Sequence, residues 1–398
     1  MLNVFFLGMV SFFTDISTEM IYPIIPLYLT AAFGATPALV GLIEGIAESL
    51  ASLLKVYSGY ISDRFQRKKA LAFSGYSTGI LYKIILIFAG SWVGVLLARV
   101  ADRFGKGVRT APRDVLVSES ADKDKIGGAF GFHKALDMAG AALGILITYF
   151  LLKDGLLENS GGSYDYKKLF LISLVPAVLG LCMFFFIKEK RQERTQNQRP
   201  KLLKSFGKLN GQLKLYLLVV LLFTLGNSSN AFLLLKAKAV GFDDVNVILL
   251  YFIYNITASI FSIPFGRMSD KIGRKKLLVA GYFIFAAVYL GFAVAFNRPF
   301  LIGMFVLYGI HTAMITGVER AFVAEIAPPE LKGTMLGLQS TVAGIALLPA
   351  SVITGQLWNR FGGGVPFIFG AALSLAAAVI LMVFMNAKKG AETYEQAD

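Results

Sequence analysis

The sequence predicts an all-α membrane protein made of two related halves, with six transmembrane helices in each half. Hydrophobic residues make up 56% of the 398-residue chain and charged residues only 16%, whereas soluble domains are about 45–50% apolar and about 25% charged. The segment GYISDRFQRKK, which begins at Gly59, returns as GRMSDKIGRKK at Gly266, 207 residues later (266 − 59). A motif that recurs half a chain length away indicates an internal duplication.

Twelve apolar runs are long enough to cross a bilayer, for which a helix needs about 20 residues. The first six are expected near 3–29, 38–60, 69–89, 92–112, 127–151 and 168–187. The second six are expected near 213–237, 245–267, 276–296, 299–321, 333–357 and 364–385. Pro23 and Pro26 fall inside the first run, where each removes a backbone hydrogen bond and should bend the helix.

The runs divide the chain into an N-terminal six-helix bundle over 1–187, a basic cytoplasmic linker over 188–212 and a C-terminal bundle over 213–398. A second pair of related segments supports this division, since Glu119 and Glu325 lie 206 residues apart (325 − 119). Each half has an even number of spans. The halves should therefore be parallel repeats, related by an axis along the membrane normal.

The net charge of +14 is concentrated in the loops at 61–69, 188–214 and 268–276. Basic loops of membrane proteins face the cytoplasm, which predicts the cytoplasmic (inner) membrane as the location, with both termini inside. This distribution favours membrane lipids over nucleic acid as the partner of these cations. A single cysteine, Cys182, excludes an internal disulfide. No cofactor or metal site is expected, and no nucleophile constellation predicts an enzyme.

The repeated segment resembles the signature of the major facilitator superfamily, G-x-x-x-D-R/K-x-G-R/K-R/K, which lies between the second and third helices of that family. The second copy matches throughout, whereas Gln66 replaces the last Gly of the signature in the first copy. The first copy matches at Gly59, Asp63, Arg64, Arg67 and Lys68. The resemblance implies a monomeric secondary transporter whose two six-helix bundles rock about a central site.

Two further segments bear on this resemblance. ARVADRFGKG resembles the fourth-helix motif of the family, in which Arg103 precedes Gly107 by four residues. Drug/proton antiporters of the superfamily carry a stretch rich in Gly and Pro in the fifth helix. Here that region, ALDMAGAALG, has Gly140 and Gly144 but no Pro, which weakens the interpretation as a multidrug exporter.

Each copy of the motif combines residues suited to a gate. A Gly lets helices approach closely, and an Asp at the membrane edge can face the positive N-terminus of another helix. Such a latch would close one side of the transporter and break during its cycle. The alternative is a topology signal whose basic residues bind anionic headgroups. The predicted gating residues are Gly59, Asp63, Arg64, Arg67, Gly266, Asp270, Lys271, Arg274, Glu319 and Arg320.

Ionisable residues inside the first-half spans are candidates for proton coupling. A charge at mid-membrane costs at least about 2.5–3.5 kcal/mol and is retained where it faces a cavity or a partner. Asp15 and Glu19 are four residues apart, as are Glu44 and Glu48, so each pair lies on one helix face. Neighbouring carboxylates in a desolvated site favour proton binding. The predicted proton-coupling residues are Asp15, Glu19, Glu44, Glu48 and Asp137.

The predicted substrate contacts differ between the halves. Arg103, together with Lys134, could bind an anionic group of the substrate, since a guanidinium binds a carboxylate or phosphate with two hydrogen bonds. The second half offers neutral hydrogen-bonding groups, namely Asn227, Asn230, Asn255 and His311. The alternative interpretation of the amides is that they form interhelical hydrogen bonds. The alternative for His311 is an interior histidine whose hydrogen bonds are made within the protein. In the first half the alternative is a static salt-bridge network of Asp15, Glu48, Arg103, Lys134 and Asp137.

The chain is thus expected to be a secondary active transporter that moves a small polar or charged organic solute by alternating access. Proton coupling is expected from the carboxylates, and efflux is one direction considered. No G-x-x-x-x-G-K-[ST] motif is present, so ATP is not the direct energy source. The alternatives are a proton-independent uniporter or importer of a nutrient or metal chelate, and a membrane sensor or scaffold that transports nothing.

Overall fold

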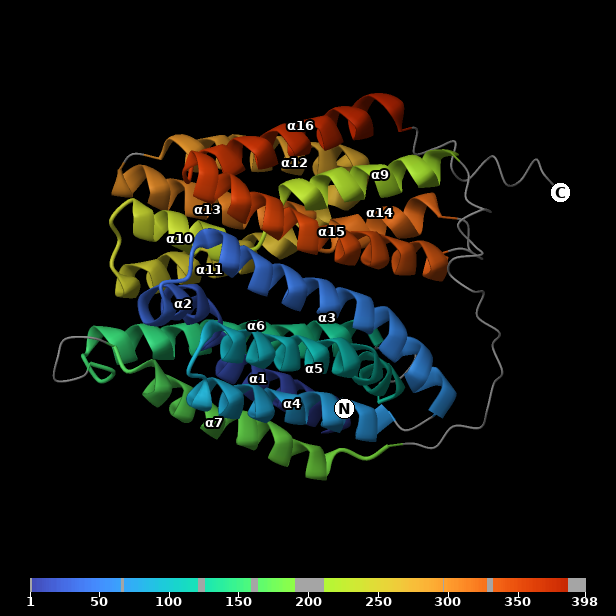
Figure 1. Ribbon diagram of the computed structural model, residues 1–398. Helices are drawn as coiled ribbons and strands as arrows, with labels where there is room; N and C mark the ends of the chain where they lie inside the picture. Colours follow the sequence, from blue (N-terminus) through green and yellow to red (C-terminus); the bar gives the residue numbers. More distant parts are fainter. Residues whose placement is uncertain are drawn as a thin grey trace. The chain divides into compact units, whose positions relative to one another are not determined.

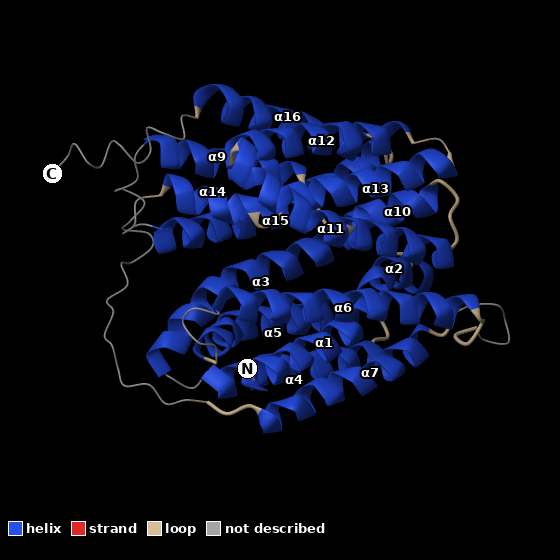
Figure 2. Ribbon diagram, turned by 180° about the vertical axis from the view of Figure 1, so that it is seen from behind, coloured by secondary structure: helices blue, strands red, loops and turns tan. Residues whose placement is uncertain are grey.

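The computed structural model describes residues 2–65, 68–120, 126–158, 164–189, 211–295, 297–327 and 332–385. Every regular element within these residues is a helix, and none is a strand (Figure 2). The chain forms two units, Met1–Arg194 with Phe242–Phe252, and Thr195–Gly241 with Ile253–Asp398. The beginning of one second-half helix therefore belongs to the first unit.

The first unit contains the first six predicted spans, and Figure 1 shows their helices, coloured blue to green, running alongside one another. Helix α5 packs most extensively against α4 and α3, and α1 packs against α6. The elements are α1 (Leu2–Glu19), η1 (Tyr22–Ile24), α2 (Ile25–Phe33), α3 (Pro37–Phe65), α4 (Lys68–Phe88), α5 (Trp92–Glu119), α6 (Ile126–Lys153), α7 (Tyr166–Cys182) and η3 (Met183–Phe186).

The second unit contains the other six spans, in which α12 packs mainly against α16 and α13. The elements of the second half are α9 (Gly211–Gly226), α10 (Ala231–Ala239), α11 (Asp244–Ile272), α12 (Arg274–Val294), α13 (Arg298–Ile315), α14 (Val318–Ile326), α15 (Lys332–Phe361) and α16 (Val365–Phe384). All twelve predicted spans are helical, which confirms the predicted fold class.

Eleven segments of the described chain are long and apolar enough to span a membrane. Helix α5 is not among them because it is rich in charged residues. It is nevertheless 28 residues long, and a rise of about 1.5 Å per residue makes it longer than the ~30 Å hydrocarbon core. Its neighbours α3 and α4 cover much of it, since Arg99, Asp102, Arg103 and Arg109 are all buried.

The first span of each half is broken at the same position of the repeat. Helix α1 ends at Glu19 and α9 ends at Gly226, 207 residues later (226 − 19). In the first half Pro23 lies in η1 and Pro26 in the first turn of α2, so the predicted bend is a break. A third break separates α13 from α14 at Gly317, whose φ is +89°. Irregular backbone inside a membrane requires polar partners, so these breaks mark polar regions of the interior.

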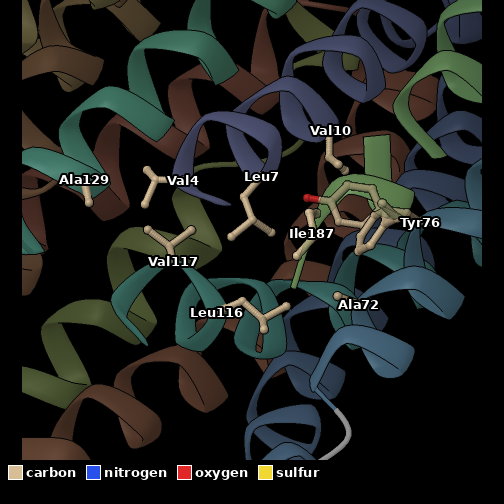
Figure 3. Packing of buried hydrophobic residues seen from close by; sticks show 10 residues of the cluster. Val4, Leu7, Val10, Ala72, Tyr76, Leu116, Val117, Ala129 and Ile187 are labelled. Atoms are coloured by element: carbon tan, nitrogen blue, oxygen red, sulfur yellow. The ribbon is translucent and has the colours of Figure 1, made fainter. Parts of the chain in front are cut away.

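Apolar side chains of α1, α4, α5, α6 and the η3 region pack together in the first unit (Figure 3). Val4, Leu7 and Val10 lie along one face of α1 at helical spacing and are at most 1% exposed. Lipid tails are as apolar as these side chains, so close van der Waals packing holds them together rather than removal from water. On the outside, Phe88 is 80% and Phe185 is 79% exposed, as expected for a surface that faces lipid.

Glycines bring α1 and α6 into close, parallel contact. A Cβ atom added to Gly140 would clash with the Phe12 carbonyl oxygen. One turn later, a Cβ atom added to Gly144 would clash with the Ile16 carbonyl oxygen. The Thr148 hydroxyl donates to the Met20 carbonyl oxygen at 2.9 Å, with the same offset of 128 residues (148 − 20 and 140 − 12). Small residues four apart commonly allow such contacts between membrane helices. This register decides which polar side chains of the two helices meet.

We expect Gly140→Ala to destabilise the protein by about 1–3 kcal/mol, because the added methyl group would overpack the contact with α1. Thermal unfolding in detergent measures the effect. Gly79→Ala in α4 is the matched control, since no atom lies within 4 Å of a Cβ built there. Equal melting temperatures for the two variants would contradict the close packing.

Candidate functional site

Two arginines of α5 bind two glutamates of α3. Arg99 donates to both carboxylate oxygens of Glu44, at 2.8 Å through Nε and 2.6 Å through Nη2. Arg99 is 0% and Glu44 is 1% exposed, so this pair is sealed from solvent. One turn along both helices, Arg103 Nη2 lies 2.8 Å from Glu48 Oε1, and the Glu48 side chain is 29% exposed. The second pair is therefore the accessible one.

Asp102 lies between the two arginines without a hydrogen bond to either. Its Oδ2 atom is 3.5 Å from Nη1 of Arg99 and 3.5 Å from Nη1 of Arg103. Within the described residues Asp102 Oδ2, Arg99 Nη1 and Arg103 Nε are buried without a hydrogen-bond partner. The ring of Tyr22, in η1, lies 5.2 Å and 5.4 Å from the two guanidinium carbons. The break after α1 thus places an aromatic face against both cations.

The register of α1 and α6 brings two carboxyl groups together. Asp15 and Asp137 lie close enough for their side chains to interact. Asp137 Oδ2 also accepts a hydrogen bond from Lys134 Nζ at 2.6 Å, and the Lys134 side chain is 64% exposed. One turn earlier, the Ser11 hydroxyl lies 3.0 Å from His133 Nε2. Both pairs have an offset of 122 residues (137 − 15 and 133 − 11), as two parallel helices in contact require.

The remaining first-half carboxylate, Glu19, lies at the end of α1 and accepts a hydrogen bond from the Tyr251 hydroxyl at 3.2 Å. Tyr251 belongs to the segment of α11 that is part of the first unit. The joint anion site predicted for Arg103 and Lys134 is not formed here, because each cation binds a carboxylate of its own. Glu48 is bound by Arg103 of a neighbouring helix, whereas Asp137 is bound by Lys134, three residues earlier on its own helix.

In the second unit, Asn230 is held at the break between α9 and α10. Its Oδ1 accepts a hydrogen bond from the Tyr308 hydroxyl at 2.9 Å, and its Nδ2 donates to the Tyr254 hydroxyl at 3.5 Å. The two tyrosine rings lie 5.1 Å apart. Asn227 begins the same break, its backbone N–H bonded to the Phe223 carbonyl oxygen at 2.9 Å. Asn255 is partly buried on α11.

His311 has the contacts of an interior structural histidine. It is 3% exposed, and Nδ1 donates to the Gly281 carbonyl oxygen at 2.9 Å. Its ring lies among those of Phe223, Phe285 and Tyr308. These contacts support the alternative interpretation of His311, that of an interior histidine whose hydrogen bond is made within the protein.

The second copy of the repeated motif joins its two helices through one glycine. Only Gly273 separates α11 from α12, and its φ of +96° is a conformation that Gly adopts without strain. Gln66 and Arg67, at the corresponding place in the first copy, lie outside the described residues. The helix that follows begins at Lys68 in the first copy and at Arg274 in the second, 206 residues apart (274 − 68).

The helices that follow the two motif copies, α4 and α12, each begin with a basic residue that binds a glutamate at the equivalent position of its half. Lys68 Nζ pairs with Glu119, and Arg274 Nη1 lies 2.9 Å from Glu325 Oε2. Arg274 also binds Asp270 at 3.2 Å. Glu119 and Glu325 are the pair whose 206-residue offset marks the repeat, so the repeat conserves this ion pair in both units.

The other predicted gating residues have varied surroundings. The Tyr282 hydroxyl donates to Glu319 at 3.1 Å, whereas Arg320 and Lys271 are exposed. No atom lies within 4 Å of a Cβ built at Gly266, so packing within the second unit does not require Gly there. Arg67 lies outside the described residues. The backbone of α3 includes three further gating residues whose side chains are not described, namely Gly59, Asp63 and Arg64.

Sequence reasoning left several members of the network unassigned. No role was assigned to Arg99, Asp102 or Tyr22 from the sequence. The spacing of Arg99 and Arg103 repeats that of Glu44 and Glu48, four residues in each case. That match was the signal for two parallel ion pairs between neighbouring helices.

Arg99→Gln should be more destabilising than Arg103→Gln. Removing Arg99 leaves Glu44 buried without its cation, a loss expected to cost about 3–5 kcal/mol, whereas Glu48 can still reach solvent. Thermal unfolding in detergent measures both variants. The double variant Arg99→Gln with Glu44→Gln should recover part of the loss. Equal melting temperatures for the two single variants would contradict the assignment of Arg99 to the sealed pair.

Comparison with known proteins identifies the family. The family model described as Major Facilitator Superfamily matches residues 7–243 and 215–396. An uncharacterised MFS-type transporter of Methanocaldococcus jannaschii is 37% identical over 386 residues, which cover 96% of this chain and 94% of that protein. Multidrug resistance protein MdtG of Escherichia coli is 23% identical, over 92% of this chain and 90% of that protein.

Solved structures show the same fold. The nucleoside transporter NupG has a TM-score of 0.77 at 12% identity, and the match covers 96% of this chain and 98% of that one. The D-xylose–proton symporter has a TM-score of 0.76 at 16% identity, covering 97% and 98%. At these identities the likeness concerns the fold alone. Together with the family match and the helical architecture, it shows that the chain is a membrane transporter, and not an enzyme, of the Major Facilitator Superfamily.

Proposed function

We propose that the chain couples the transport of a small polar solute with an anionic group to the movement of protons. The observation that carries the proposal is the proximity of Asp15 and Asp137, which the parallel contact of α1 and α6 brings about. Two ionised carboxylates in a desolvated site repel one another, so this arrangement favours a proton on one of the two groups. Two carboxyl groups that share a proton can release it when their surroundings change. The pair is thus a one-proton site inside the first unit.

Lys134 favours Asp137 as the ionised member of the pair. Its ammonium group donates to Asp137 Oδ2 at 2.6 Å, and such a charge-assisted bond stabilises the carboxylate form. The proton then belongs to Asp15. We assign Glu19 and Glu48 supporting roles in coupling, because both are partly exposed and each bonds a neighbour that can move. Glu44, sealed against Arg99, serves the structure of the unit.

The accessibility of the Arg103–Glu48 pair supports an anionic substrate group. The buried charged residues in the described interior of the first unit, away from the helix ends, are Lys83, Arg99, Arg103, Arg109, Glu44 and Asp102. Asp15, Glu19, Glu48 and Asp137 add partly buried carboxylates, so these residues leave no excess of positive charge. A charge inside a membrane is retained where it faces a cavity or a partner, and the partner of Arg103 is one that solvent can reach.

Arg103 is the cation that the substrate would bind. A carboxylate or phosphate of the substrate would compete with Glu48 for the guanidinium, since that glutamate is 29% exposed. Asp102, 3.5 Å from Arg103 Nη1, would hold the arginine in place while Glu48 is displaced. A displaced Glu48 could take up a proton, and anion binding would then be linked to proton binding.

Amides of the second unit are the candidates for solute recognition in that unit. Asn227 and Asn230 flank the break between α9 and α10, where backbone groups also become available. Broken helices commonly form substrate sites in transporters. We propose Asn227, Asn230 and Asn255 as recognition residues. His311 is less suited, because its ring packs among aromatic residues and bonds a carbonyl oxygen.

Alternating access would depend on ion pairs at the repeated motifs. In the second unit Arg274 joins Asp270 and Glu325, and we propose that this link forms and breaks during the cycle. The basic residues of these motifs favour an orientation with the motifs and both termini at the cytoplasmic face of the inner membrane. The proposed working form is a monomer.

A proton-independent uniporter or importer is the main alternative, and export of a drug, as the name of MdtG suggests for that relative, is another. The charged interior of the first unit favours a polar solute over an apolar drug. The direction of transport is left to the experiment, since the same proton site can serve symport and antiport.

Reconstitution into proteoliposomes with an imposed pH gradient tests the proposal. Panels of organic acids, sugar phosphates, nucleosides and cationic drugs would be screened for flux together with the change in internal pH. We expect gradient-driven flux of a polar anionic solute. Asp15→Asn and Asp137→Asn should reduce accumulation at least tenfold, whereas the exposed Asp154→Asn should behave as wild type. Flux that is indifferent to the gradient, and unchanged in both variants, would contradict proton coupling.

A further inference from the structure

Each of the two helices that follow a motif copy begins with two adjacent basic residues. These are Lys68 and Lys69 at the start of α4, and Arg274 and Lys275 at the start of α12. The first residue of each pair binds a glutamate. The second residue of each pair binds main-chain carbonyl oxygens instead, and the proposed mechanism gives it no role.

Lys275 holds the end of α16. Its ammonium group donates to the carbonyl oxygens of Met382 at 3.0 Å and of Met385 at 2.7 Å. Helix α16 ends at Phe384, and the last carbonyl groups of a helix have no partner within it. A cation at this end is also favoured by the helix dipole. The Gln212 side chain donates to the Phe384 carbonyl oxygen at 3.4 Å, so the first turn of α9 contacts the same helix end.

Lys69 holds the end of the sixth span of the first half in the same way. Its ammonium group donates to the carbonyl oxygen of Ile187 at 2.6 Å, and Ile187 directly follows η3. In return, the Glu189 carboxylate accepts hydrogen bonds from the backbone N–H groups of Lys68 at 2.8 Å and of Lys69 at 3.3 Å. The N–H groups of a first helical turn have no partner within the helix. The contacts between α4 and this segment therefore run in both directions.

Helix α1 fastens the same segment. The Asn3 side chain donates to the Lys188 carbonyl oxygen at 2.7 Å and accepts from the Lys188 backbone N–H at 3.1 Å. Ile187, Lys188 and Glu189 are therefore each held by a helix of the first unit. The basic linker predicted over 188–212 begins here, so its starting point is fixed on the first unit.

The contacts do not follow the residue alignment of the repeated motif. In the sequence repeat, whose copies begin 207 residues apart, Lys275 aligns with Lys68 (275 − 207). In the structure Lys275 corresponds to Lys69 (275 − 206), because α4 and α12 begin at Lys68 and Arg274, 206 residues apart (274 − 68). Lys69 lies one residue beyond the family signature, which ends at Lys68 in the first copy. Sequence comparison alone therefore gives Lys69 no role.

We propose that Lys69 and Lys275 are clamps that fasten the third span of each half to the end of its sixth span, and that the first clamp also fixes the point at which the linker leaves. Each clamp directly follows the residue that binds the glutamate of the repeat. A motif that moves during gating then carries the sixth span with it, and in the first unit it carries the linker. The inference needs neither proton coupling nor a particular substrate.

The alternative is that these lysines bind anionic lipid headgroups, as basic residues at a membrane surface can. Carbonyl oxygens already accept hydrogen bonds from both ammonium groups, which disfavours that alternative. Lys188 and Lys276 lie next to the same contacts and are exposed. Their side chains face solvent or headgroups, and they serve as matched controls.

Lysine acetylation separates the two possibilities in the wild-type protein. Full-length protein would be treated with N-hydroxysuccinimide acetate in neutral detergent, and again in vesicles of phosphatidylcholine and phosphatidylglycerol. Peptide mass spectrometry gives the rate at each lysine. Lys69 and Lys275 should react several-fold more slowly than Lys188 and Lys276 in both media. Protection that appears only in the vesicles would assign the two residues to headgroups and overturn the inference, as would equal rates in both media.

Hydrogen–deuterium exchange measures the clamps themselves. In Lys275→Met, backbone amides of the last turn of α16 should exchange at least about tenfold faster than in wild type, the factor expected when a hydrogen bond to a charged group is lost. In Lys69→Met the same change should appear over 183–189. Lys69→Arg and Lys275→Arg should stay close to wild type, since a guanidinium can donate to the same carbonyl groups.

Three further variants sharpen the exchange experiment. Lys68→Met should leave 183–189 unchanged, because Glu189 binds the backbone of Lys68 and not its side chain. Lys188→Met and Lys276→Met should behave as wild type. Unchanged exchange in Lys69→Met and in Lys275→Met would overturn the clamps, and an equal effect of Lys68→Met at 183–189 would overturn the assignment of the first clamp to Lys69. If a variant does not fold, the acetylation rates of the wild type decide.

Discussion

The close contact between α1 and α6 determines which polar side chains of the first unit meet, and the proposed proton site depends on it. The contact arises from backbone packing. Gly140 and Gly144 allow α6 to touch α1, and the resulting register places Asp137 near Asp15. A larger side chain at either glycine would separate the helices and, with them, the two carboxyl groups of the proposed site. The proposed chemistry therefore depends on two residues that carry no functional group.

The charged interior combines ion pairs of different accessibility. Arg99 and Glu44 form a sealed pair with two hydrogen bonds, which fits the network that holds a bundle together. One turn away, Arg103 binds an accessible Glu48 and has a second carboxylate, that of Asp102, nearby. The proposed division of roles, structural for Glu44 and coupling for Glu48, rests on this difference in exposure.

The fold could be predicted from the sequence because its signals are local. Apolar runs of sufficient length predict spans, and the repeat at Gly59 and Gly266 predicts two halves. The pairing of α1 with α6 side chains could not be predicted in this way, since it depends on the register between two helices more than a hundred residues apart. Gly140 and Gly144 carried that information but were compared only with a family signature. The break at 227–230 was also missed, because a short run of Asn and Ser remains compatible with a helix.

Infrared difference spectroscopy tests the shared proton most directly, since a protonated carboxyl group absorbs apart from a carboxylate. The protein in lipid at neutral pH should show a protonated-carboxyl band that disappears in Asp15→Asn and in Asp137→Asn but remains in Asp154→Asn. Absence of the band in the wild type, or its persistence in both variants of the pair, would contradict the account.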